Sequence, residues 1–82
     1  MIVNSENNQF ELKIGEHVAS AKFRIEENNL FIDYVFAPPE LRGTGAASDL
    51  MKEIANYAKE KNLKIIPICS YAVKWCERAK LK

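Results

Sequence analysis

The sequence predicts an α+β fold with the element order β-β-β-α-β-α, in which an antiparallel meander is followed by a parallel, splayed pair of last strands. Two patterns carry this prediction. In the first third of the chain, apolar and polar residues alternate, which is typical of half-buried strands. From residue 44 onward, apolar residues instead recur every three or four positions, as on one face of a helix. The 82 residues suffice for one domain, residues 1–82.

The first three strands are predicted at residues 9–14, 19–26 and 30–36. Short polar turns separate them, so neighbouring strands are expected to run antiparallel. The third strand is apolar except for Asp33, and this pattern predicts a central strand that is covered on both faces.

A long amphipathic helix is predicted at residues 44–61, with Thr44 as its N-cap and Asn62 as its C-cap. The apolar run 63–69 follows a strand and a helix. It therefore predicts a parallel partner for the third strand, reached by a right-handed crossover. Pro67 has no N–H to give to a strand ladder, so this parallel pair is expected to diverge near it.

Composition and charge narrow the functional classes. The net charge of +1 gives no bias toward nucleic acid, and no segment approaches the ~20 apolar residues of a membrane span. The polar, acidic start of the chain is unlike a signal peptide, so we expect a cytoplasmic protein without nucleic-acid or membrane partners. Cys69 and Cys76 lie seven positions apart and His17 is the one histidine, so free thiols and no metal site are expected.

The most informative segment is the turn before the long helix, which reads Arg42-Gly43-Thr44-Gly45-Ala46-Ala47. Bare N–H groups at a helix start, the positive end of the helix dipole and the charge of Arg42 suit a phosphate-bearing ligand. Taken alone, the two glycines fit a purely structural turn equally well. The context favours a ligand, because the crevice of such a sheet lies at the carboxyl ends of its parallel strands, here residues 36–37 and 68–69.

At these residues the chain resembles the GCN5-related N-acetyltransferase (GNAT) superfamily, whose acyl-coenzyme A motif reads Arg/Gln-x-x-Gly-x-Gly/Ala. More narrowly, it resembles small acetyltransferase-like proteins of about this length, through Leu41-Arg42-Gly43-Thr44-Gly45 and Lys64-Ile65-Ile66-Pro67-Ile68-Cys69-Ser70-Tyr71. The resemblance implies a minimal GNAT-like fold and acetyl-coenzyme A (acetyl-CoA) as cosubstrate, without a metal. It implies that the pyrophosphate binds at Arg42, Gly43, Thr44, Gly45, Ala46 and Ala47, and that the pantetheine arm lies beside Phe36 and Ala37.

The candidates for catalysis lie around the last helix, which is predicted to be capped by Ser70. The resemblance implies that Cys69 is a nucleophile or acyl carrier, and a thiol at a helix N-terminus favours the thiolate; the alternative is a small buried apolar side chain. Tyr71 could protonate the departing thiolate of coenzyme A, as the resemblance implies, or simply pack against Trp75 one turn later. Asp33 is a general base if it is buried, or it lies on a solvated or hydrogen-bonded face.

Two functions follow from the resemblance. The first is a minimal N-acetyltransferase that moves an acetyl group from acetyl-CoA to an amine acceptor, for which an amine of a protein is one candidate. The second is a non-catalytic acyl-CoA-binding module. Relatives commonly carry His-Thr directly after the position of Asp33, where this chain has Tyr34-Val35, and that departure favours the module. A third hypothesis is a small interaction domain in which the glycine turn is only structural. The sequence fits either a monomer or a homodimer.

Overall fold

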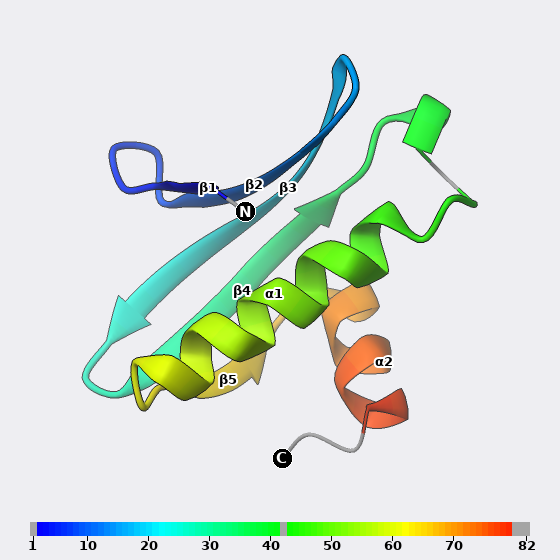
Figure 1. The fold of residues 1–82 in the computed structure, drawn as a ribbon. Coiled ribbons are helices and arrows are strands. Elements are labelled where there is room, and N and C mark those ends of the chain that lie inside the picture. The colour runs from blue at the N-terminus through cyan, green and yellow to red at the C-terminus, as the bar shows by residue number, and fades with distance from the viewer. Residues whose placement is uncertain (1, 42, 80–82) are drawn as a thin grey trace.

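The computed structural model describes residues 2–41 and 43–79, and its five strands form one mixed sheet in the order β1-β2-β3-β4-β5 (Figure 1). The first three neighbouring pairs are antiparallel and the pair β4–β5 is parallel. The α+β class, the meander and the parallel last pair predicted from the sequence are thereby confirmed. The strands are β1 (Ile2–Asn4), β2 (Gln9–Ile14), β3 (His17–Glu26), β4 (Asn29–Phe36) and β5 (Lys64–Pro67).

Strand β1 was not predicted from the sequence. It has three residues and pairs with β2, with Val3 opposite Phe10. Three residues are too few to reveal an alternating pattern, so only the partner strand makes this segment recognisable as a strand.

The helices are α1 (Ala46–Glu60) and α2 (Ser70–Arg78), preceded by a 3-10 turn at η1 (Pro39–Leu41). The prediction that Thr44 caps α1 is wrong, because the N-cap is Gly45 and the Thr44 hydroxyl donates to the carbonyl of Leu41. Likewise Ser70 is the first residue of α2, and Cys69 occupies the N-cap position.

The C-cap of α1 is Lys61, one residue before the predicted Asn62. Asn62 has a positive φ of 56°, which asparagine tolerates better than most residues. Its N–H donates to the carbonyl of Lys59, and the N–H of Leu63 donates to that of Ala58. These two bonds form a Schellman motif, which satisfies carbonyls that the helix itself leaves unpaired and turns the chain toward β5.

One apolar core joins the helices to one face of the sheet. Helix α1 crosses that face, and α2 lies beside α1 near β5 (Figure 1). The buried core residues are Phe10, Ala19, Ala21, Phe23, Leu30, Ile32, Leu41, Ala46, Leu50, Met51, Ile54, Ala58, Ala72 and Cys76.

Among residues 2–41 and 43–79, neither helix has the length and apolar character needed to cross a bilayer.

Strand β4 changes character at a β-bulge. Lys22 of β3 pairs with Tyr34 while Phe23 pairs with Ile32, so Asp33 has no partner in the ladder. The extra residue shifts the alternation of core-facing side chains by one position, so that both Ile32 and Val35 contact the core.

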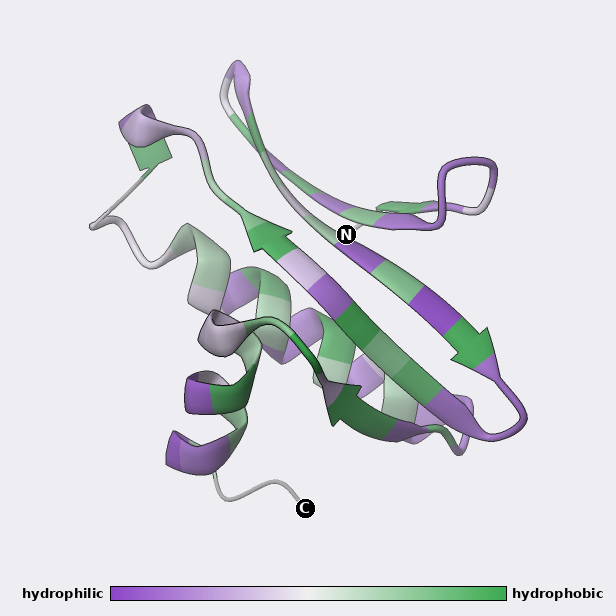
Figure 2. Ribbon diagram, turned by 180° about the vertical axis from the view of Figure 1, so that it is seen from behind, coloured by the Kyte–Doolittle hydropathy of each residue, from purple (hydrophilic) through white to green (hydrophobic). Residues whose placement is uncertain are grey.

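The prediction that this strand is covered on both faces is wrong. Tyr34 and Phe36 remain 55% and 40% exposed, and from behind no helix passes in front of β3 and β4 (Figure 2). Its continuous apolar run therefore does not mean burial on both sides. Residues before the bulge fill the core, and those after it reach an open surface.

Candidate functional site

The two parallel strands separate beside the bulge of β4. Their ladder ends where Ile32 pairs with Pro67. The N–H groups of Ile68 and Cys69 then both donate to the carbonyl of Ile32, at 3.0 and 3.2 Å, and the chain turns into α2. Beyond Ile32, β4 continues to Phe36 without a β5 partner in the part of the chain that the structure describes. The divergence predicted from Pro67 is confirmed.

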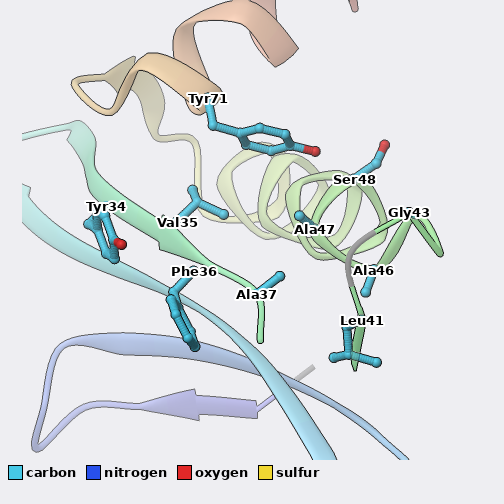
Figure 3. A pocket seen from close by; sticks show the side chains of 11 residues that line it. Tyr34, Val35, Phe36, Ala37, Leu41, Gly43, Ala46, Ala47, Ser48 and Tyr71 are labelled. Carbon is cyan, nitrogen blue, oxygen red and sulfur yellow. The ribbon is translucent and has the colours of Figure 1, made fainter. Parts of the chain in front are cut away.

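A cavity of about 350 Å³ opens at this divergence (Figure 3). This volume is at the lower end of the range for small-molecule sites. Its walls come from the end of β4, the turn before α1, the first turn of α1, and the start of α2. The lining residues are Tyr34, Val35, Phe36, Ala37, Leu41, Gly43, Gly45, Ala46, Ala47, Ser48 and Tyr71.

Most of the predicted cofactor-binding residues surround this cavity. Six of the eight line it, namely Phe36, Ala37, Gly43, Gly45, Ala46 and Ala47. Thr44 is not among the lining residues, and its hydroxyl donates to the carbonyl of Leu41. Arg42 lies outside the described residues. The contacts of these residues with a ligand stay predictions.

The turn before α1 depends on the backbone freedom of glycine. Gly43 and Gly45 have φ angles of 83° and 84°, which L-residues rarely adopt. A Cβ atom built at either position would meet no atom within 4 Å, so backbone conformation rather than lack of space calls for glycine here.

The same turn leaves several N–H groups of α1 without acceptors. The first helical bond runs from Asp49 N to Gly45 O at 2.9 Å. The N–H groups of Ala46, Ala47 and Ser48 precede it and have no carbonyl to bond to within the helix. All three residues line the cavity, so the positive end of the α1 dipole faces this space.

Comparison with known proteins agrees with this arrangement. A family model described as GCN5-related N-acetyl-transferase matches residues 9–81. The chain belongs to the GCN5-related N-acetyltransferase family. The match spans β2 to α2 and so includes every element that lines the cavity. Among curated proteins, no sequence matches the chain.

Tyr71 is the ionisable side chain of this GNAT domain that reaches the cavity from α2. Its ring extends from α2 toward the first turn of α1, beside Ala47 and Ser48 (Figure 3). Burial raises the pKa of the Tyr71 phenol, and the positive charge of Arg78 has a smaller effect in the opposite direction. The phenol therefore keeps its proton at neutral pH and can serve as a proton donor.

Cys69, the predicted acyl carrier, lies next to the cavity rather than in its wall. It is half-buried as the N-cap of α2, packs against the core, and is not among the described lining residues. Both thiols of the chain, Cys69 and Cys76, are free. Burial raises the pKa of the Cys76 thiol, which is consistent with a packing role.

The structure supports the second interpretation of Asp33, in which its side chain lies on a solvated or hydrogen-bonded face. Its carboxylate accepts bonds from Nε of Arg24 at 3.0 Å and from Nη2 at 3.2 Å, on the face of the sheet that no helix covers. Arg24 also lies over the ring of Phe31, 4.7 Å from its centroid, and pairs with Glu26. Asp33 is one member of a polar cluster centred on Arg24 and does not line the cavity.

Sequence reasoning missed four lining residues, namely Tyr34, Val35, Leu41 and Ser48. The bulge at Asp33 shifts the alternation along β4, so that Val35 rather than Tyr34 contacts the core, and no residue pattern revealed the bulge. Ser48 was recognisable in principle, since it occupies the first turn of a helix whose N-terminus was already expected to face a ligand.

Proposed function

We propose that this GNAT protein binds acetyl-CoA in the cavity between β4, α1 and Tyr71 and transfers its acetyl group to an amine. The observation that carries the proposal is a juxtaposition. The free N–H groups at the start of α1 and the part of β4 that has no β5 partner border the same space. A ligand with an anionic end and an amide-containing arm matches both borders.

The start of α1 suits the phosphate end of the cosubstrate. The N–H groups of Ala46, Ala47 and Ser48 donate hydrogen bonds, and the helix dipole adds positive potential. Gly43 and Gly45 present backbone without side chains on the same wall, so an oxygen-rich group can approach closely. The residues present therefore fit a pyrophosphate.

The end of β4 suits the pantetheine arm. Residues 34–36 have a strand partner on the β3 side, whereas their β5 side faces the divergence. An extended arm that carries amides can hydrogen-bond along such an edge, as an added strand does. The side chains of Val35 and Phe36 provide an apolar wall beside it.

Tyr71 is the proposed catalytic residue. Acetyl-CoA supplies an acetyl thioester, from which an amine takes the acetyl group and leaves the thiol of coenzyme A. The Tyr71 phenol holds a proton at Oη within the cavity wall, where it can be given to a departing sulfur. Cys69 belongs to a second version of the mechanism, in which the acetyl group rests on the thiol before it reaches the amine.

The experiment has a binding step and a transfer step. With acetyl-CoA at 100 times its Kd, we expect about 2.7 kcal/mol of added stability, visible as a clear rise in Tm. The absence of a shift at millimolar acetyl-CoA contradicts the proposal. Incubation with acetyl-CoA and a panel of small amines and lysine-containing peptides should then release free coenzyme A and produce acetylated acceptor, detected by mass spectrometry.

Cys69→Ala separates the two versions of the mechanism. Direct transfer predicts unchanged turnover in this variant. An acetyl-Cys69 intermediate predicts that turnover is abolished, and that the intact mass of the wild-type protein increases by one acetyl group when no acceptor is present.

A non-catalytic acyl-CoA-binding module is the second candidate. Two observations favour it, namely Tyr34-Val35 at the position of the family's His-Thr pair and the place of Cys69 outside the cavity wall. This function predicts a thermal shift with acetyl-CoA but no release of coenzyme A with any acceptor. Acetyl transfer to any amine excludes it.

A further inference from the structure

A side-chain hydrogen bond connects α2 to the cavity wall on α1. Nε1 of Trp75 donates to Oγ of Ser48 over 3.0 Å, in a partly buried position. Ser48 itself lines the cavity, in the first turn of α1. No other side-chain hydrogen bond is seen between α1 and α2 in the described part of the chain.

Trp75 and Tyr71 lie one turn apart on the same side of α2. Residues at i and i+4 of a helix are neighbours on its surface, so a shift of α2 that moves one ring also moves the other. Both rings also pack against the core. Trp75 thus anchors, through Ser48, the face of α2 that carries Tyr71 into the cavity wall.

Helix α2 needs such an anchor. It has nine residues, and helices of that length are not stable without tertiary contacts. Its buried residues, Ala72 and Cys76, are small and give apolar contact, which does not specify a direction. The indole N–H bond is directional, because indole donates only along its N–H bond and Ser48 must lie on that line.

We propose that Trp75 is a positioning residue. Its hydrogen bond to Ser48 sets the distance between α2 and the first turn of α1, and with it the place of the Tyr71 hydroxyl in the cavity. The expected effect of Trp75 on kcat rests on the proposed function. The effect of Trp75 and Ser48 on the position of the Tyr71 ring can be tested whether or not the protein catalyses transfer.

Trp75→Phe and Ser48→Ala remove the two ends of the bond and keep most of the packing. Because one such bond contributes about 0.5–1.5 kcal/mol, each variant should lower kcat by about 2–13-fold. Ser48→Thr keeps a hydroxyl acceptor and should restore most of the activity. In a Tyr71→Phe background, Trp75→Phe should change kcat no further, because Trp75 acts through the Tyr71 hydroxyl.

Tyrosine ring NMR supplies the test that is independent of activity. In protein labelled with ¹³C at the tyrosine rings, the Tyr71 signal, assigned by its absence in Tyr71→Phe, should shift in both Trp75→Phe and Ser48→Ala. The Tyr57 signal should stay in place, since Tyr57 contacts Phe10 in the core. If Trp75→Phe does not fold, Ser48→Ala carries the test alone, because alanine is favourable in a helix.

The outcomes separate this inference from the proposed function. A wild-type protein that transfers no acetyl group contradicts the proposed function, and the NMR comparison still decides the coupling. An unchanged Tyr71 signal in both variants overturns the positioning role. So does a loss of kcat in Trp75→Phe that is equally large with and without the Tyr71 hydroxyl.

Discussion

The two halves of β4 are consecutive in the chain and differ in almost every physical respect. Residues 29–32 are paired with β3 on one side and β5 on the other, and Leu30 and Ile32 are fully buried. Residues 34–36 are paired with β3 alone, expose Tyr34 and Phe36, and border the cavity. Asp33, the bulged residue, separates the halves.

This comparison teaches that one strand can serve stability and ligand binding in turn. The first half places side chains in the core that joins the sheet to the helices. The second half has an edge without a β5 partner, which the proposed function uses to hold the pantetheine arm. The following predictions test this division, from the largest expected effect to the smallest.

The largest effect is expected in the buried half. Ile32→Ala leaves a cavity in the core and should lower the free energy of unfolding by about 2–5 kcal/mol. Tyr34→Ala, two residues later, should stay within about 0.5 kcal/mol of wild type and should instead weaken acetyl-CoA binding. Urea unfolding and calorimetric titration measure the two quantities. Equal losses of stability in the two variants would mean that the halves are not distinct.

Removal of the Tyr71 hydroxyl comes next. Tyr71→Phe should lower kcat by about 10²-fold while the Kd for acetyl-CoA changes little, because only the proton donor is lost. Tyr57→Phe is the control, since Tyr57 packs on Phe10 away from the cavity. Steady-state kinetics and calorimetry provide the two numbers, and a fall in affinity that matches the fall in kcat would assign Tyr71 to binding instead.

The pH dependence of kcat sharpens this prediction. Burial raises the pKa of Tyr71, so the phenol keeps its proton to higher pH than an exposed tyrosine. Proton donation is fully present below that pKa and is lost as pH rises through it. We expect an alkaline fall in kcat for the wild type that is absent in Tyr71→Phe. The same fall in both proteins would assign it to another group.

Glycine substitutions test the turn at the open end. Gly45→Ala places an L-residue at a φ of 84° and should cost about 1–2 kcal/mol of stability. Gly15→Ala imposes a similar strain, since Gly15 has a φ of 62° and an added Cβ would also meet no atom. Only Gly45→Ala should also weaken acetyl-CoA binding in calorimetric titration. Equal affinities in the two variants would contradict a ligand role for the turn.

The smallest effect is expected at the bulge itself. Asp33→Ala removes the carboxylate partner of Arg24 on an exposed face, where ion pairs contribute little. The urea midpoint should barely move, and acetyl-CoA affinity should fall slightly if the pair helps to hold β4 at the divergence. Glu26→Ala, which removes the other partner of Arg24, should leave affinity unchanged. A large loss of stability in Asp33→Ala would show that the bulge depends on this pair.

The sequence predicted much of this architecture because local chemistry and tertiary environment agree there. Alternation located β2 and β3, the helical period located α1, and Pro67 indicated where the parallel pair ends. Prediction failed where the outcome depends on a partner. Strand β1 is recognisable only beside β2, and the N-cap of α1 is Gly45 rather than Thr44, whose hydroxyl bonds to Leu41 instead.

By itself, the sequence determined the family, the order of the strands and helices from β2 onward, and the two glycines that open α1. Each of these depends on residue type or on spacing along the chain. Only the tertiary structure decided which side chains meet in the cavity. The bulge at Asp33 reassigns the faces of β4, and the bond from Trp75 to Ser48 joins residues that lie 27 positions apart. Such contacts depend on backbone register and packing, which no local pattern encodes.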